Sequence, residues 1–303
     1  MKVLITGGTG LIGRALSGFL LEQGDEVTVL SRSADPAGVP SGVRTATWDG
    51  RTASGWGRLV EEVDAVVNLA GENIGSSPWS PERRRRILDS RLNAGTALTD
   101  AIRAAERKPR ALLQASAVGV YGPLKEELAT ESSPLGTDFL ASVARRWEES
   151  TRAVEDLGVR RLVTRTAIVL SRGQGSILAN FELPVRLFAG GPLGSGKQWL
   201  PWVHIADEIG AMRFLLTNEA ARGVYNLCAP DVVRQGEFSR RLAQKLGRPY
   251  WLPAPAFAIR AALGSMSTLV LDGQHQVPQR LIEAGYAFQF PTLDAALADL
   301  YKN

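Results

Sequence analysis

The sequence predicts an α/β protein built on a Rossmann-type, doubly wound parallel sheet with a smaller C-terminal substrate lobe. Three observations support this fold class. Short apolar strand patterns alternate with helix patterns through the first half of the chain, which is typical of a parallel sheet with helices on both faces. A glycine-rich turn, Gly7-Gly-Thr-Gly-Leu-Ile-Gly13, follows the first strand directly. After about residue 170 the pattern changes to loops rich in glycine and proline.

The elements of the first half can be assigned in order. Residues 1–6 form an apolar strand, and a helix is predicted over 14–24 after the glycine turn. Five more strands are predicted before the change of pattern near residue 170, at 26–30, 43–48, 65–69, 111–115 and 161–166. Long helices over 79–107 and 138–157 connect the last three of these strands.

The second half contains a loop at 190–196, a helix over 205–216 and a strand over 223–227 that returns to the sheet. Three more helices are predicted over 237–246, 253–271 and 294–301, the second as a cap over a cleft. We expect residues 1–170, together with 203–230, to form a Rossmann domain. Residues 171–202 and 231–303 are expected to form the substrate or lid lobe.

Bulk composition narrows the class of protein. Of the 303 residues 45% are hydrophobic and 22% are charged, as in a globular domain, and a net charge of +4 gives no strong attraction to nucleic acid or membrane. The single cysteine, Cys228, excludes a disulfide framework, and with only two histidines we expect no metal site. A strand that starts at residue 2 leaves no room for a signal peptide, and no run of eighteen apolar residues occurs. We therefore expect a cytoplasmic monomer or homodimer that acts on a small molecule.

The glycine turn predicts a dinucleotide site. Glycines between a strand and a helix let the backbone approach a pyrophosphate, and the helix N-terminus presents free N–H groups and a positive dipole end to it. The residues expected to contact the phosphates are Gly7, Thr9, Gly10, Leu11, Ile12 and Gly13. The alternative is a turn that only eases packing between helix and sheet.

The end of the second strand favours NADP(H) over NAD(H). An acidic residue there would bind the free 2′-hydroxyl of NAD, but the chain has Ser31-Arg32. A guanidinium pairs with a 2′-phosphate, so Ser31 and Arg32 are predicted cofactor contacts; the alternative is a surface arginine. Asp49, after the third strand, either meets the adenine edge or is a solvated turn residue.

The fourth strand leads into another part of the same site. Ligands bind at the carboxyl ends of strands in open α/β sheets, so the main chain of Leu69, Ala70 and Gly71 is expected to contact the cofactor. Glu72 faces cofactor or substrate, or is a solvated loop residue. The four consecutive arginines at 83–86 point around a helix and are expected to be a solvated helix start.

Several motifs resemble a known family. Asn68-Leu-Ala-Gly71 and Ser116-Ala-Val-Gly-Val-Tyr-Gly122, with the glycine turn, resemble the extended short-chain dehydrogenases/reductases. The likeness narrows to the atypical "epimerase family protein" branch, with its C-terminal domain of unknown function, at 70–74, 90–91, 136–141, 201–205 and 271–280. The resemblance implies an NADP(H)-binding oxidoreductase or nucleotide-sugar epimerase-like enzyme of unknown substrate. It also places Arg91 near the cofactor riboses or phosphates, the alternative being a surface salt bridge, and the backbone of Val169 near the nicotinamide amide.

The chain departs from this family at the catalytic residues. The wider family uses a Ser or Thr, a Tyr, and a Lys four residues after the Tyr. The corresponding helix positions here are Phe139 and Val143, and the serine position is Ala117. Tyr121 and Lys125 have the right spacing, but Gly122-Pro123 prevents a shared helix face. Tyr121 and Ser116 remain weak candidates for proton transfer, with packing on the sheet edge as the alternative for Tyr121.

Other candidate substrate residues lie in the second half. Arg165 either contacts a ligand or makes a buried ion pair, and Lys197 belongs to a lid or to a mobile loop. His204 and Asp207 stand at a strand-to-helix junction and have either a substrate or a structural role. The missing Tyr–Lys pair leaves a second functional hypothesis open, a redox-inactive NADP(H)-binding regulatory protein that acts through a partner.

Overall fold

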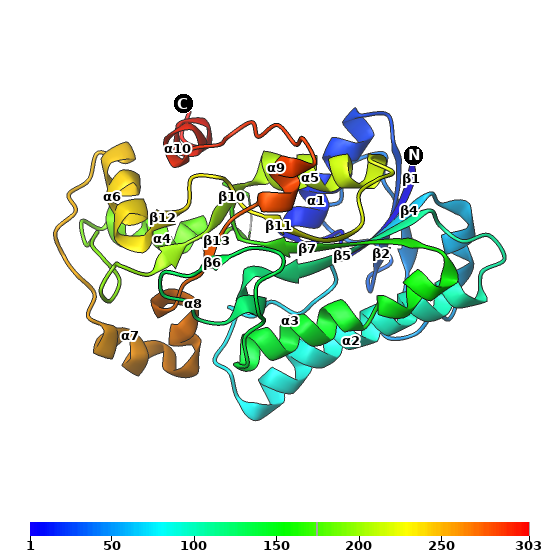
Figure 1. Ribbon diagram of the computed structural model, residues 1–303, viewed down its shortest axis with the longest axis horizontal. Helices are drawn as coiled ribbons and strands as arrows, with labels where there is room; N and C mark the ends of the chain where they lie inside the picture. Colours follow the sequence, from blue (N-terminus) through cyan, green and yellow to red (C-terminus); the bar gives the residue numbers. More distant parts are fainter. Residues whose placement is uncertain (174, 303) are drawn as a thin grey trace.

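The computed structural model describes residues 1–173 and 175–302, and its centre is a seven-stranded sheet whose neighbouring strands are all parallel. The strand order is β11-β7-β5-β4-β1-β2-β3 (Figure 1). The bounds are β1 Lys2–Thr6, β2 Glu26–Ser31, β3 Arg44–Thr47, β4 Ala65–Asn68, β5 Ala111–Ala117, β7 Arg160–Thr166 and β11 Gly223–Leu227. This order confirms the predicted Rossmann-type fold.

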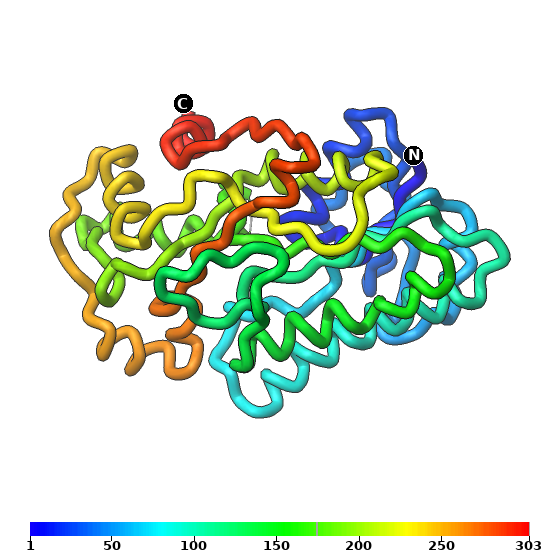
Figure 2. The backbone as a smooth tube through the Cα atoms, viewed as in Figure 1, coloured from blue at the N-terminus to red at the C-terminus, as the bar shows by residue number. Residues whose placement is uncertain are grey.

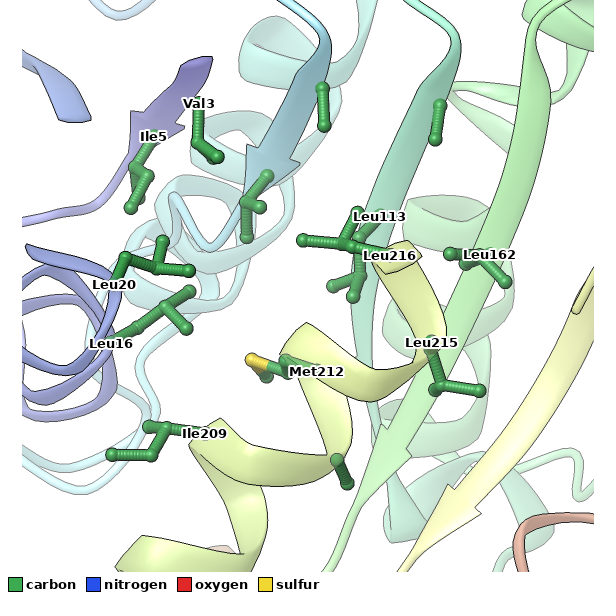
Figure 3. Close-up of a cluster of buried hydrophobic side chains, with 14 of the residues drawn as sticks. Val3, Ile5, Leu16, Leu20, Leu113, Leu162, Ile209, Met212, Leu215 and Leu216 are labelled. Atoms are coloured by element: carbon green, nitrogen blue, oxygen red, sulfur yellow. The ribbon is translucent and has the colours of Figure 1, made fainter. Parts of the chain in front are cut away.

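Helices cover both faces of the sheet, as Figure 1 shows for the long pair α2 and α3 on one side. α1 (Leu11–Glu22) and α5 (Ile205–Thr217) pack on the opposite face from α2 (Pro81–Ala104) and α3 (Phe139–Glu149). The α1–α5 layer is closed by Leu16, Leu20, Met212 and Leu215 against strand residues such as Val3 (Figure 3). Burial of central strands on both faces explains their near-continuous apolar sequences.

A second core lies beside the sheet. α4 (Leu178–Arg186), α6 (Gln235–Lys245) and α10 (Leu293–Leu300) pack around Trp202, Phe238 and other fully buried apolar residues. Two short pairs frame it, the parallel strands β8 (Ile168–Leu170) and β10 (Trp202–His204) and the antiparallel strands β9 (Trp199–Leu200) and β12 (Val233–Arg234).

The chain then returns to the first core. α7 (Ala256–Leu263) and α8 (Thr268–Leu271) lead to β13 (His275–Gln276), which pairs with β6 (Leu128–Ala129), and to α9 (Gln279–Glu283). Figure 2 traces this orange-to-red return. Leu281 of α9 is fully buried in the core that contains β1 and α1. Residues of the segment 281–288 therefore pack against the first core.

Several helices begin or end at residues other than the predicted ones. α1 begins at Leu11 rather than 14, directly on the glycine turn, and α4 was not expected at all. The predicted helix over 138–157 ends at Glu149 and continues as a 3₁₀ segment, Arg152–Leu157. The predicted helix over 253–271 is interrupted at Gly264, whose φ of +54° ends α7.

Candidate functional site

A cleft of about 990 Å³ opens at the carboxyl ends of β1, β2 and β4. Its lining combines the glycine turn, the segment after β2, the turn after β3, the loop after β4 and one face of α2. The residues from the first four segments are Gly7, Thr9, Gly10, Leu30, Ser31, Arg32, Ser33, Pro36, Ala37, Trp48, Asp49, Gly50, Arg51, Leu69, Ala70, Gly71 and Glu72. Most of the predicted cofactor residues thus meet in one cleft.

The glycine turn needs its glycines for different reasons. Gly7 has φ +71°, and a Cβ there would lie 2.7 Å from the carbonyl carbon of Leu69. At Gly13, in the first turn of α1, a Cβ would meet the Gly7 carbonyl oxygen at 2.4 Å. Gly10 has φ −77° and lines the cleft, and a Cβ there would have only the Gly7 oxygen nearby, at 3.3 Å. The first two glycines are thus required by the fold, whereas Gly10 keeps space free in the cleft.

α1 begins at this turn without a capping side chain, since Gly10 occupies the N-cap position. Leu11, Ile12 and Gly13 form its first turn, and the amides of a first helical turn have no acceptor within the helix. These amides and the helix dipole make the start of α1 suited to an anion.

The segments after β2 and after β3 differ in how their polar side chains are hydrogen-bonded. The Ser31 hydroxyl accepts a hydrogen bond from the Ser33 amide (3.1 Å), whereas Arg32 is exposed in the cleft. The Asp49 carboxylate accepts hydrogen bonds from Arg51 and Thr52 amides, both at 2.8 Å. These hydrogen bonds within the turn lower the pKa of Asp49. They also engage its carboxylate with the neighbouring backbone. Asp49 thus lines the cleft and is also the turn aspartate of the alternative interpretation.

Two arginines of α2 hold the loop after β4. Arg83 is 5% exposed, pairs with Glu72, and donates to the Asn73 carbonyl and the Ser76 hydroxyl. The expectation that residues 83–86 form a solvated helix start is therefore wrong for Arg83, because the loop folds back over it.

Arg91 donates from Nη1 to the carbonyl oxygens of Glu72 (3.1 Å) and Ile87 (2.9 Å), and its guanidinium lies over the Trp147 ring. A Cβ on Gly71 would lie 3.0 Å from the guanidinium carbon. The surface salt bridge considered for Arg91 is therefore not present among the described residues; the side chain supports the loop from behind the cleft.

The proton-transfer candidates are instead joined in a buried polar network. The Tyr121 hydroxyl donates to Asn226 Oδ1 (2.6 Å) and accepts from Arg165 Nη1 (3.1 Å). Arg165 forms a two-pronged ion pair with Glu148, at 2.9 and 3.0 Å, and the Ser116 hydroxyl donates to the same carboxylate at 2.6 Å. Arg165 thus makes a buried ion pair, and the hydroxyl of the buried Tyr121 is bonded to Asn226 and Arg165.

Phe139 and Val143, the positions that the family resemblance assigns to its Tyr and Lys, are apolar; Val143 is buried and Phe139 is partly buried. The Phe139 ring meets the Trp79 ring edge-on at 5.1 Å, and Val143 is buried with Ile87 and Met266. Neither residue belongs to the lining of the 990 Å³ cleft. Side chains from the segment before α2 and from the segment between α7 and α8 cover this face of α3.

The remaining candidates lie outside the cleft. The His204 imidazole caps α5 by accepting the Ala206 amide at Nδ1 (3.1 Å), and burial lowers its pKa. Asp207 accepts the Gln289 and Phe290 amides and so fixes the C-terminal segment.

Three further residues noted in the sequence lie in other strands and loops, outside the cleft lining. Lys197 is exposed in its loop, and Val169 is buried in the β8–β10 pair. Cys228 is fully buried, and burial raises the pKa of its thiol. Among residues 1–173 and 175–302, no group of His, Cys, Asp or Glu is arranged to hold a metal ion, and no helix combines the length and apolarity needed to span a membrane.

Sequence reasoning missed one wall of the cleft. This wall is a single face of α2 at helical spacing, formed by Arg86, Asp89, Ser90, Asn93 and Ala94. The spacing of three, four, seven and eight residues from Arg86 was available as a signal. The missed partners of the buried arginines, Glu72 for Arg83 and Glu148 for Arg165, are distant contacts that no local pattern records.

Comparison with known proteins places these features in context. A family model described as "NAD dependent epimerase/dehydratase family" matches residues 3–228, and one described as "Domain of unknown function (DUF1731)" matches 254–300. The chain is 36% identical to the epimerase family protein YfhF of Bacillus subtilis (100% of this chain, 99% of the relative) and 39% identical to the epimerase family protein SDR39U1 of Bos taurus (99% of each). A crystal structure of human epimerase family protein SDR39U1 with NADPH has a TM-score of 0.90 and 36% identity, with 99% of each chain covered.

Proposed function

Because this chain belongs to the NAD-dependent epimerase/dehydratase family, we propose that its cleft binds NADP(H). One observation carries the proposal: the glycine turn at the start of α1 and Arg32 at the end of β2 line the same cleft, and no acidic residue occupies the β2 end. The printed description of the human SDR39U1 structure names NADPH as its bound molecule, which agrees with this choice.

The lining fits the adenosine and pyrophosphate part of such a dinucleotide. Gly10 leaves room for a pyrophosphate against the start of α1, and Arg32 faces the place of a 2′-phosphate. The main chain of Leu69, Ala70 and Gly71 forms the opposite wall. We assign the cofactor contacts of the sequence prediction to these residues, with Arg91 as support for the Gly71 wall rather than as a direct contact.

We further propose that the second core, around Trp202 and Phe238, belongs to a substrate lobe and that the protein is an oxidoreductase or an epimerase-like enzyme. A bound nicotinamide supplies or accepts a hydride, which needs only alignment with the substrate. The chain itself holds the cofactor and lacks the Tyr–Lys couple, since Phe139 and Val143 stand at those positions. The hydroxyls of Tyr121 and Ser116 are committed to Asn226 and Glu148, so the proton moves through solvent or the substrate.

A second function is favoured by a different observation. Trp79, Ile87 and Met266 enclose the α3 face that bears Val143, so the position of the family's charged residue is filled with apolar side chains. A protein that binds NADP(H) without turning it over, and signals through a partner, needs no proton couple at this face.

Turnover assays distinguish the two functions. The protein is incubated with NADPH and, separately, with NADP⁺, against panels of carbonyl compounds, alcohols and nucleotide sugars, with sugar epimers separated by chromatography. An enzyme oxidises NADPH, reduces NADP⁺ or interconverts epimers with at least one member. A Gly10→Val variant should lose that activity. Tight NADPH binding with no turnover on any panel supports the regulatory function.

A further inference from the structure

A second arginine lines the adenosine end of the cleft. Arg51 lies in the turn after β3 and shares the cleft lining with Arg32, Trp48 and Gly50. Within residues 1–173 and 175–302, neither Arg32 nor Arg51 forms an ion pair with a carboxylate, in contrast to Arg83 and Arg165. Two exposed guanidinium groups without internal counter-charges thus enter one end of the cleft from different strands.

The turn that carries Arg51 is fixed by its neighbour. Asp49 Oδ1 accepts the amides of Arg51 and Thr52 at 2.8 Å each, and its Oδ2 accepts the Thr52 hydroxyl at 2.8 Å. Gly50 between them has φ +74°, a conformation that favours glycine. The backbone at Arg51 is therefore set by side-chain hydrogen bonds before any ligand arrives.

The same turn packs beside the first arginine. A Cβ built on Gly50 would lie 3.8 Å from Arg32 Cδ, which is ordinary van der Waals contact. The stem of Arg32 and the turn at 49–52 are thus neighbours. Both carboxylate oxygens of Asp49 already accept hydrogen bonds from the turn, so the aspartate is turned toward its own backbone.

We infer that Arg51 is a second specificity-determining residue for the 2′-phosphate of NADP(H), together with Arg32, and that Asp49 is the residue that positions it. The inference rests on the proposed function, because it requires the adenosine end of the dinucleotide to lie here. Phosphate carries up to two negative charges and accepts hydrogen bonds on several oxygens, so two guanidinium forks from separate strands suit it better than one. A free 2′-hydroxyl gives Arg51 no anion to bind.

Calorimetric titrations test this inference with Arg51→Ala and a matched control. Arg58 is exposed in the 3₁₀ segment Gly57–Glu62, outside the cleft lining. Arg51→Ala should weaken NADPH binding by about twofold to fivefold, the range for a solvent-exposed charged contact, and leave NADH unchanged. Arg58→Ala should change neither. Adenosine 2′,5′-bisphosphate and adenosine 5′-monophosphate, used as fragments, should show the same difference as NADPH and NADH.

The Asp49 variants test the positioning role. Asp49→Ala removes the acceptor that fixes the turn and should weaken NADPH binding, with NADH unchanged. Asp49→Asn keeps an oxygen acceptor for the Arg51 and Thr52 amides and removes a negative charge near the phosphate, so it should restore or improve NADPH affinity.

Two outcomes would overturn the inference at different levels. If Arg32→Ala abolishes the preference for NADPH while Arg51→Ala leaves it intact, Arg51 has no part in specificity, although the proposed cofactor site stands. If the unaltered chain shows no preference for NADPH, the proposed function itself fails. A thermal melt of each variant confirms that the exposed substitutions leave the fold unchanged.

Discussion

Arg91 shows how a single residue shapes the proposed phosphate site. It pairs with no carboxylate in the described part of the chain. Instead it donates to two backbone carbonyls, and its guanidinium lies over the Trp147 ring. Burial and the nearby Arg83 lower the pKa of Arg91 to about 10, so the guanidinium stays charged at neutral pH. A positive charge thus lies behind Gly71, where it favours an anion in the cleft.

Arg32 is expected to contribute the larger share of the cofactor preference. Arg32→Ala should remove most of the difference between NADPH and NADH affinity, because a hydrogen bond to a charged group contributes roughly 1.5–3 kcal/mol. NADH affinity should stay the same. Isothermal titration of both dinucleotides measures this, with Arg58→Ala as the control. Retention of the full preference in the variant would show that another group binds the 2′-phosphate.

A buried carboxyl in α5 makes stability depend on pH. Glu208 is fully buried, its Oε1 accepts the Thr166 hydroxyl (2.8 Å), and burial raises its pKa from 4.5 to about 8. Between these pH values the unfolded chain has lost the Glu208 proton and the folded chain has kept it. This group therefore makes stability fall as pH rises, by up to about 1.4 kcal/mol per pH unit.

Glu208→Gln should remove this slope and stabilise the protein at pH 8, since the amide oxygen still accepts the Thr166 hydroxyl. Urea unfolding at pH 5 and pH 8 measures the change. Glu219→Gln, at an exposed position, is the control and should leave the slope in place. Equal pH slopes for Glu208→Gln and the unaltered chain would show that Glu208 is ionised in the folded state.

At the scale of elements, two glycines at the start of α1 have different roles, one in dinucleotide binding and the other in folding. Gly10→Val should abolish dinucleotide binding because the branched side chain enters the cleft, with a smaller effect on stability since φ is −77°. Gly13→Val should instead destabilise the fold, because its Cβ would lie 2.4 Å from the Gly7 oxygen. Thermal melts with and without NADPH measure both effects. Undiminished NADPH protection in Gly10→Val would contradict the phosphate-site assignment.

The enclosed face of α3 gives a second test at this scale. Val143→Lys places a charge among Ile87, Trp79 and Met266, so it should destabilise the protein by several kcal/mol. Glu149→Lys adds the same side chain at an exposed position of α3 and should cost about 1 kcal/mol or less. Urea unfolding compares them. A Val143→Lys variant as stable as Glu149→Lys would show that this face opens to solvent.

For the whole molecule, the features that depend on short stretches of sequence were predictable from the sequence. Strand and helix alternation predicted the parallel sheet, the glycine turn and Arg32 predicted residues of one cleft, and the family resemblance is confirmed by the comparisons. Contacts between distant segments were not predictable in this way. The burial of Arg83 under the loop at 72–76, and of Leu281 in the first core, depends on where the chain returns in space.

The central claim, that the cleft is an NADP(H) site, is tested most directly by calorimetric titration of the unaltered protein with NADPH and with NADH under the same conditions. The glycine turn predicts that both dinucleotides bind, and Arg32 predicts that NADPH binds at least about tenfold more tightly, equivalent to roughly 1.4 kcal/mol. Equal affinities, or no binding of NADPH, would contradict the account.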